Sequence, residues 1–555
     1  MEAILIANLA PIMFAALVIF LLSGFPVAFA LAANGLFFGL VGIELGLLKP
    51  ELLQALPNRI YGIMSNDTLL AIPFFTFMGL ILERSGMAED LLDTIGQLFG
   101  PLRGGVAYAV IFVGALLAAT TGVVAASVIS MGLISLPIML KYGYDAKVAS
   151  GVIAASGTLA QIIPPSLVLI VMADQLGRSV GDMYQAAFLP GLLLTMMYAG
   201  YILMLSLFRP KWVPALPAEA RNLRQPNGNS GVPSLLVLIV ISSLAAYAFS
   251  HYYQNLHPEI AKDALGIYAG CVGIGIAFVL ALINRKLKIG LLSRMAEQVT
   301  FVLIPPLALI FLVLGTIFLG VATPTEGGGM GALGAIILAL MNGRLNWKLT
   351  KQALDSTSRL SSFVMFILIG STVFALVFRG INGDIWVEHL LTSLPGGQIG
   401  FLIAVNILFF VLAFFLDFFE LAFILVPLVA PVAEKLGINL IWFGVLLGVN
   451  MQTSFMHPPF GFALFYLRSV APKIVKTSDI YWGAIPFVIA QIIMVGLIIA
   501  FPNLVSVDSQ EAKKEEIQLD ITTPLDDMPA PSFDLPKESG MDEMRDTQAS
   551  PAHSL

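Results

Sequence analysis

The length of its apolar runs constrains this chain more than any other feature. Apolar runs follow one another from residue 4 to residue 501, and many are as long as a bilayer-spanning helix. A helix needs about 20 predominantly apolar residues to cross a membrane, so runs of this length predict membrane helices. Of the 555 residues, 58% are apolar and 12% are charged, whereas soluble domains carry about 25% charged residues. The sequence predicts an all-α polytopic membrane protein and excludes a water-soluble enzyme.

Charge is distributed unevenly along the chain. Residues 508–555 hold twelve acidic and four basic side chains, a balance of −8, while the whole chain has a formal net charge of −6. This segment has little apolar content and several prolines, which is typical of a solvated, disordered segment. We therefore expect an acidic disordered tail at 506–555, either without a function or with a docking role.

An internal repeat divides the apolar part of the chain. Pro137 and Pro431 lie 294 residues apart, and the double prolines Pro164-Pro165 and Pro458-Pro459 keep the same spacing (458 − 164 = 294). The spacing also relates Gly86 to Gly380, Pro101 to Pro395, Lys141 to Lys435 and Gly143 to Gly437. Membrane proteins built from two such halves are commonly transporters, with the binding site at mid-depth between the halves.

We expect two repeats that are inserted in opposite senses, with paired backbone gaps facing each other. The predicted organisation is a first repeat at 1–212, a linker at 213–231, an inserted helix pair with an amphipathic segment at 232–298, a second repeat at 299–505 and the tail at 506–555.

Each double proline lies inside an apolar run. Proline lacks an N–H and clashes with the carbonyl four residues earlier, so it interrupts a helix. In hydrocarbon the freed carbonyls need partners or a hydrated cavity, so we expect a buried broken helix at each site. Freed carbonyls with hydroxyls nearby suit a dehydrated Na⁺, and the N-terminus of the restarted helix can face an anion. A simple proline kink is the structural alternative.

A polar interruption precedes each double proline by about forty residues. The first contains Thr120, Thr121 and Gly122, and the second contains Asp417. A short apolar run, a polar tip and another short run form the pattern of a re-entrant hairpin. A buried Asp417 is costly unless it is paired or binds a cation, and a carboxylate at a helix end in water is the alternative.

These motifs resemble those of the large membrane subunit of the tripartite ATP-independent periplasmic (TRAP) transporters. The resemblance covers about 5–210 and 295–500. It rests on SGTLAQIIPPS, the Asp-Met-Tyr…Pro-Gly stretch at 182–191, ATPTE at 322–326, FFLD at 414–417 and the second double proline. It implies an elevator-type transporter in the bacterial inner membrane, with two re-entrant hairpins and two broken helices. It also implies sodium-driven import of organic anions.

The same resemblance implies partners and site residues. The partners are a periplasmic substrate-binding protein and a small four-helix membrane subunit. Sodium sits between each tip and its broken helix, and the substrate sits between the tips. The implied cation ligands are Thr120, Thr121, Ser156, Gly157, Thr158, Ala160, Asp417, Asn450, Gln452 and Thr453. The implied substrate-binding residues are Thr121, Gly122, Pro164, Pro165, Asp417, Pro458 and Pro459.

The chain departs from the family pattern in several places. His457 stands where threonine is commoner, and Phe418 follows Asp417 where proline is commoner. An insertion at about 225–290 adds two membrane helices, and the acidic tail is extra.

Two other functions remain open. A stand-alone cation/dicarboxylate symporter or exchanger of similar architecture would work without a binding protein. An intramembrane hydrolase would need paired catalytic side chains, but Asp417 has no evident membrane aspartate partner except Asp174, and His457 is the one histidine inside an apolar run. No Walker A motif is present, so ATP hydrolysis is not expected. We expect a transporter without catalytic residues.

Overall fold

The structure is a computed structural model that describes residues 5–6, 8–121, 124–221, 223, 231–258, 260, 262–288, 290–458 and 461–505. Within these ranges the regular elements are helices, with no strand. Nine of the described helices are long and apolar enough to cross a membrane, and counting two bent helix pairs as spans gives up to 11. The prediction of an all-α polytopic membrane protein is confirmed, while the predicted tail lies outside the described residues.

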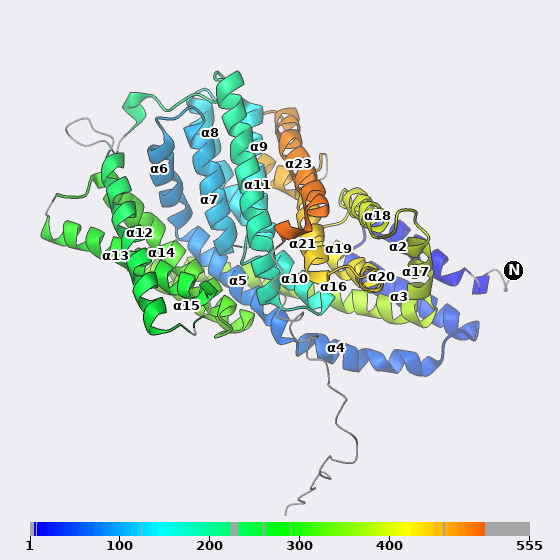
Figure 1. Cartoon of the computed structure of the whole chain (residues 1–555). Helices are drawn as coiled ribbons and strands as arrows, with labels where there is room; N and C mark the ends of the chain where they lie inside the picture. Colours follow the sequence, from blue (N-terminus) through cyan, green and yellow to red (C-terminus); the bar gives the residue numbers. More distant parts are fainter. Residues whose placement is uncertain are drawn as a thin grey trace, which may run out of the picture. The chain divides into compact units, whose positions relative to one another are not determined.

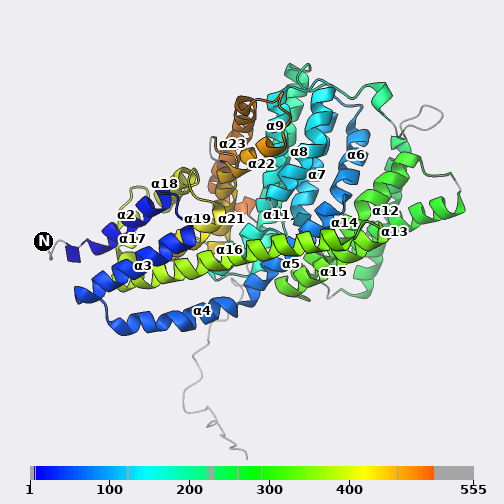
Figure 2. The ribbon, with the colours of Figure 1, turned by 180° about the vertical axis from the view of Figure 1, so that it is seen from behind.

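Ten α-helices of the described residues lie within the predicted first repeat. They are α2 (Leu9–Leu22), α3 (Val27–Glu44), α4 (Leu56–Met64), α5 (Asp67–Arg84), α6 (Met87–Phe99), α7 (Gly105–Thr121), α8 (Val124–Lys141), α9 (Ala146–Thr158), α10 (Leu167–Leu176) and α11 (Val180–Phe208). Figures 1 and 2 show α3 alongside the long helix α16 (Trp347–Gly380) and α5 alongside α15 (Pro324–Met341), so elements from the two halves pack against each other.

The helices after the insertion begin with α14 (Arg294–Phe318), which starts just before the predicted second repeat, and the rest lie within it. In addition to α15 and α16, these are α17 (Gly383–Thr392), α18 (Gly397–Leu412), α19 (Phe418–Ile424), α20 (Val426–Lys435), α21 (Leu440–Met451), α22 (Phe462–Val470) and α23 (Thr477–Ala500). Helices α17 and α18 meet at an angle of 116°.

The spacing of 294 residues recurs in the helix boundaries. Helix α9 begins at Ala146 and α21 at Leu440, and the two starting positions are 294 residues apart (440 − 146). The caps match as well, because Asp145 accepts a hydrogen bond from the backbone N–H of Lys147 and Asn439 accepts one from that of Ile441, each at 2.9 Å. Asp and Asn are among the residues that start helices best, so the sequence sets the same helix start in both repeats.

The two helices of the insertion pack against each other and against α14. They are α12 (Val232–Leu256) and α13 (Lys262–Leu287), and both contain a stretch long and apolar enough to span a membrane.

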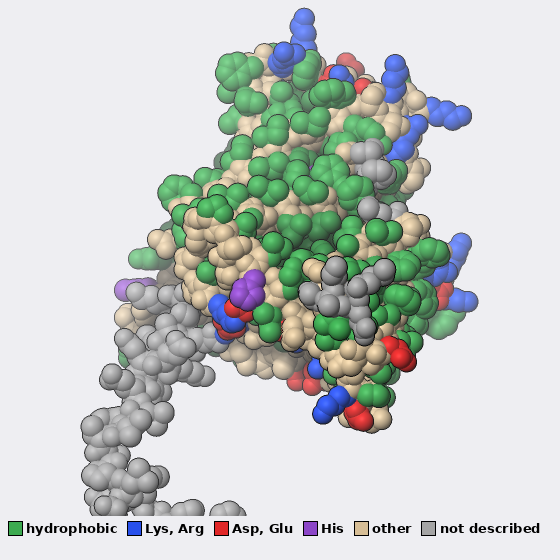
Figure 3. All heavy atoms as spheres, turned by 90° about the vertical axis from the view of Figure 1, so that its right-hand side faces the viewer, with side chains coloured by type: hydrophobic (Ala, Val, Ile, Leu, Met, Phe, Trp, Pro, Cys, Tyr) green, Lys and Arg blue, Asp and Glu red, His purple; other side chains and the backbone are tan. Residues whose placement is uncertain are grey.

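Apolar side chains cover much of the face seen in Figure 3, with Lys and Arg mostly toward the margins of the view. Such an exposed apolar surface suits contact with lipid rather than water.

Candidate functional site

Both double prolines interrupt helices in the buried interior. In the first repeat α9 ends at Thr158, the 3₁₀ segment η2 (Leu159–Gln161) follows, and α10 restarts at Leu167. In the second repeat α21 ends at Met451, η4 (Gln452–Phe455) follows, and α22 restarts at Phe462. The predicted broken helices are therefore confirmed. Each interruption begins upstream of the prolines, because the residue before a proline avoids the helical conformation and the ring clashes with an earlier carbonyl.

The two breaks touch each other through equivalent positions. The side-chain Nε2 of Gln452 donates a hydrogen bond to Thr158 Oγ1 at 3.1 Å, and these residues are 294 apart in the sequence (452 − 158). Two equivalent positions of a repeat meet each other only near the two-fold axis that relates the copies. The contact therefore places a local pseudo-two-fold axis between the breaks, which face each other as the repeat predicts.

Several buried oxygens at the breaks have no hydrogen-bond partner among the described residues. They are Ser156 Oγ, Gln161 Oε1, Gln452 Oε1 and Ser454 Oγ. Buried polar atoms are normally partnered, and hard cations prefer oxygen ligands, so these atoms fit a Na⁺ ion. Ser156 and Gln452 are predicted ligands. Gln161 and Ser454 were missed, and their signal is a polar residue in the same apolar run just before the prolines.

The first hairpin approaches the first break very closely. It consists of α7 and α8, which pack on each other and on α9. A Cβ added at Gly157 would lie 2.3 Å from Val128 Cγ2 of α8, and one added at Gly114 of α7 would lie 2.5 Å from Ser156 Cβ. Gly157 and the predicted ligand Ala160 are buried and have no polar side-chain atom, so they can serve a cation only through their carbonyls.

Most of the tip of the first hairpin lies outside the residues and side chains that the structure describes. Thr120 and Thr121 end α7, but the placement of their side chains is not described, and Gly122 lies outside the described residues. Their predicted roles as ligands stay predictions. The first double proline is well described, since Pro164 and Pro165 are both buried beside the break.

The second break is held by an amide pair that the sequence analysis missed. Asn450 Nδ2 donates to the backbone carbonyl of Asn406 at 2.8 Å and to its Oδ1 at 3.0 Å. Thr453 Oγ1 donates to the Asn450 carbonyl at 2.7 Å. The sequence feature that could have identified Asn406, in α18, is an isolated amide side chain within a long apolar run. Asn450 and Thr453, both predicted cation ligands, thus donate hydrogen bonds to protein groups, and their predicted roles as ligands stay predictions.

The second tip spans residues 413–417, between α18 and α19. Asp417 caps α19, because its Oδ1 accepts from the backbone N–H of Glu420 at 2.9 Å, and its own N–H donates to Glu420 Oε2 at 2.9 Å. This reciprocal capping box satisfies two N–H groups at the helix start. Asp417 is half-buried, and its predicted role as a ligand stays a prediction.

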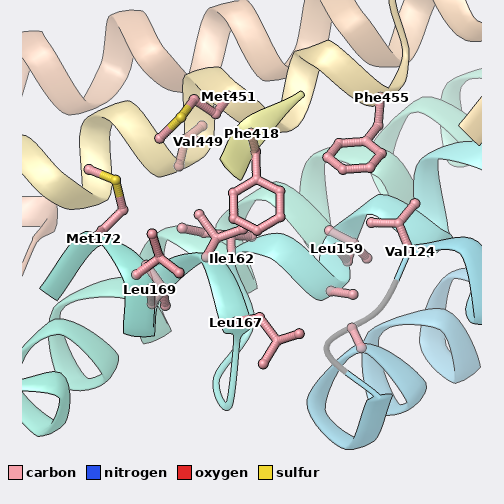
Figure 4. Packing of buried hydrophobic residues seen from close by; sticks show 14 of the residues in the cluster. Val124, Leu159, Ile162, Leu167, Leu169, Met172, Phe418, Val449, Met451 and Phe455 are labelled. Atoms are coloured by element: carbon pink, nitrogen blue, oxygen red, sulfur yellow. The ribbon is translucent and has the colours of Figure 1, made fainter. Parts of the chain in front are cut away.

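Aromatic rings pack around the second break. The His457 ring is buried, with centroids 4.3 Å from that of Phe410 and 4.2 Å from that of Phe414. Figure 4 shows the Phe418 ring on the side of α19 that faces Ile162 of the first break, and α19 contacts α10. Of the second double proline, Pro458 is half-buried and Pro459 lies outside the described residues.

The ATPTE motif forms a second capping box, at the start of α15. Glu326 Oε2 accepts from the Thr323 backbone N–H at 2.8 Å, and Thr323 Oγ1 accepts from the Glu326 backbone N–H at 3.2 Å. Because the pair caps a helix at an exposed position, it contributes to helix stability.

Comparison with known proteins assigns the family. The model of the DctM component of the tripartite ATP-independent periplasmic transporters matches residues 14–504. The C4-dicarboxylate TRAP transporter large permease protein DctM of Pseudomonas aeruginosa is 28% identical over 426 residues, which are 76% of this chain and 82% of that protein. The sialic acid TRAP transporter permease protein SiaT of Haemophilus influenzae is 22% identical over 457 residues, or 82% of this chain and 62% of SiaT.

The crystal structure of the YdaH transporter of Alcanivorax borkumensis aligns with a TM-score of 0.49 and 13% identity, over 82% of this chain and 90% of that one. The family match covers nearly all of the described chain, and these relatives are named as transporter permeases rather than enzymes. The chain is a multi-pass inner-membrane protein that belongs to the DctM component family of the tripartite ATP-independent periplasmic transporters.

Proposed function

We propose that this chain is the transport subunit of a sodium-coupled importer for a small carboxylate that a periplasmic binding protein delivers. Large permeases of this family work with such a binding protein and with a small membrane subunit. The matched relatives are named for C4-dicarboxylates and sialic acid, which are both carboxylates. The substrate class of this chain is inferred from those names and from the two restarted half-helices, whose N-termini favour anions.

The observation that supports sodium coupling is the set of buried, unpartnered oxygens at the two breaks. Ser156 Oγ in the first break and Gln452 Oε1 in the second are fully buried and accept no hydrogen bond from the described residues. Leaving such atoms unpaired costs free energy, and a dehydrated Na⁺ at each break would recover it. Bound sodium would also order the tips and thereby raise the affinity for the anion, and the coupling is reciprocal.

An elevator movement fits the contact between the breaks. Because Gln452 and Thr158 share a hydrogen bond, both breaks can move together as one body that carries cations and substrate. Helices α3 and α16, which pack side by side along much of their length in Figure 2, would belong to the part that stays in place. Transporters with paired repeats commonly alternate access by such relative movement.

Uptake into proteoliposomes tests the proposal. The chain is reconstituted with its small subunit, and a radiolabelled carboxylate first identified on the partner binding protein is added outside. We expect uptake that requires both the binding protein and an inward sodium gradient. Uptake that ignores the gradient would refute sodium coupling. Sodium-driven uptake without the binding protein would instead support the stand-alone symporter.

A further inference from the structure

We propose that the side-chain amide of Gln452 couples cation binding at the two breaks, so that the two sites fill together. This inference rests on the proposed function, because it takes the two sodium sites from it. The feature that carries it is one amide group, whose nitrogen donates to a hydroxyl of the first break and whose oxygen has no partner among the described residues.

The nitrogen end of the amide is firmly attached to the first break. Gln452 Nε2 donates to Thr158 Oγ1 at 3.1 Å, and that hydroxyl donates in turn to the Ala155 carbonyl at 2.8 Å. Gln491 Nε2 lies 3.5 Å from the same oxygen. A hydroxyl has one donor and two acceptor positions, so the Thr158 hydroxyl is fully engaged by protein groups. Its role in this conformation is to receive the amide rather than to bind a cation.

The oxygen end of the amide is available to a cation. Gln452 Oε1 has no partner within the described part of the chain, and the residue is completely buried. Ser454 Oγ, two residues further along the same break, is also buried without a partner. An amide oxygen that is buried and unpaired is a strong ligand for a hard cation.

Binding at one end of an amide changes the other end. A cation on Oε1 polarises the amide and makes its N–H a better donor, because linked polar groups strengthen one another in a low-dielectric interior. The bond to Thr158 then tightens, and Thr158 lies two residues after Ser156, whose hydroxyl is one of the unpartnered oxygens of the first break. A cation bound at the second break thereby raises the cation affinity of the first. Thermodynamic linkage requires that a cation at the first break raises the affinity of the second by the same factor.

The consequence is that a carrier with one bound cation is less populated than two independent sites would give. A carrier with a single bound sodium ion could carry that ion across without the second one. Such a leak would dissipate the sodium gradient without driving import. The coupling group belongs to the second break and reaches the first through its bond to Thr158.

The test removes the coupling acceptor and leaves the free amide oxygen in place. Thr158→Val deletes the hydroxyl but keeps the side-chain shape, and Thr158→Ser restores a hydroxyl. Ser150→Ala is the matched control, because Ser150 is an equally buried hydroxyl of α9 that donates to Ala146 within its own helix. For each variant of the full complex, uptake and the thermal unfolding midpoint are measured against sodium concentration.

We expect the Hill coefficient for sodium to be lower in Thr158→Val than in the wild type, and to keep its wild-type value in Thr158→Ser and Ser150→Ala. If valine prevents folding, Thr158→Ala takes its place. A coefficient that does not change in Thr158→Val would overturn the coupling role and leave sodium import intact. A wild-type coefficient near one would also overturn it. A wild-type protein that does not respond to sodium at all would remove the proposed function, and the coupling with it.

Discussion

The two broken helices begin and break at corresponding positions of the repeat but are held by different side chains. At the first break, Gly114 and Gly157 allow both arms of the hairpin to approach α9 almost to backbone contact. At the second break an amide pair, Asn450 with Asn406, and a group of aromatic rings fill the corresponding space. The repeat therefore keeps the interruption itself, while each copy builds its own surroundings.

The equivalent positions Ser156 and Asn450 show this difference most clearly (450 − 156 = 294). The Ser156 hydroxyl is buried and unpartnered in the described structure, whereas the Asn450 amide donates twice to Asn406. We infer that the first break offers its own side chain to a cation. At the second break the Asn450 amide nitrogen supports the structure, and Gln452 and Ser454 present the unpartnered side-chain oxygens.

The largest effect is expected where the first break depends on close approach. In Gly114→Ala the new Cβ would lie 2.5 Å from Ser156 Cβ and 3.1 Å from the Ser156 carbonyl oxygen. Overpacking of this kind costs about 2–3 kcal/mol of stability, and we expect transport to be lost. Thermal unfolding of the purified complex and uptake both report it.

Gly448→Ala in α21 is the control for this substitution, because its Cβ would meet nothing closer than 3.7 Å. We expect a change within about 0.5 kcal/mol. Equal losses in the two variants would contradict the view that the first break depends on the close approach of α7 to α9.

The next effect separates the two equivalent positions. Asn450→Ala leaves buried polar groups of Asn406 without their partner and should cost about 1–2 kcal/mol of stability. Ser156→Ala removes a hydroxyl that has no partner in the described structure, so stability should stay within about 0.5 kcal/mol while half-maximal uptake needs more sodium. Chemical unfolding and sodium titration of uptake measure the two effects. The reverse pattern would make Asn450, rather than Ser156, the free cation ligand of this equivalent pair.

Sequence reasoning found the breaks but not what holds them. The double prolines and the spacing of 294 residues predicted both interruptions, because proline acts on the backbone locally. The contact between Thr158 and Gln452 was not predicted, because the spacing shows which positions are equivalent but not that equivalent positions touch. The close approach of Gly114 was missed as well, since nothing local distinguishes it among the 50 glycines.

A smaller effect is expected at the second tip. Asp417→Ala removes the N-cap of α19 and should cost about 1 kcal/mol, whereas Asp417→Asn keeps an oxygen that can cap the helix. If the charge of Asp417 also serves a cation, Asp417→Asn will weaken sodium activation without loss of stability. Uptake and unfolding measured on both variants decide this. Unchanged sodium activation in Asp417→Asn would make Asp417 a structural cap alone.

The smallest effect is expected away from both breaks. Glu326 belongs to the exposed capping box at the start of α15, and glutamine can replace glutamate in such a box. We expect Glu326→Gln to change stability by less than about 0.5 kcal/mol and to leave the sodium titration of uptake unchanged. A clear shift in that titration would move the cation site toward α15.

The most direct test of the account is a density map of the full complex in sodium, compared with one in which a large organic cation replaces sodium. The account predicts density within bonding distance of Ser156 Oγ and of Gln452 Oε1 in sodium, and its loss from both places in the other map. Empty density at both breaks in sodium, or continuous helices through the two double prolines, would contradict it.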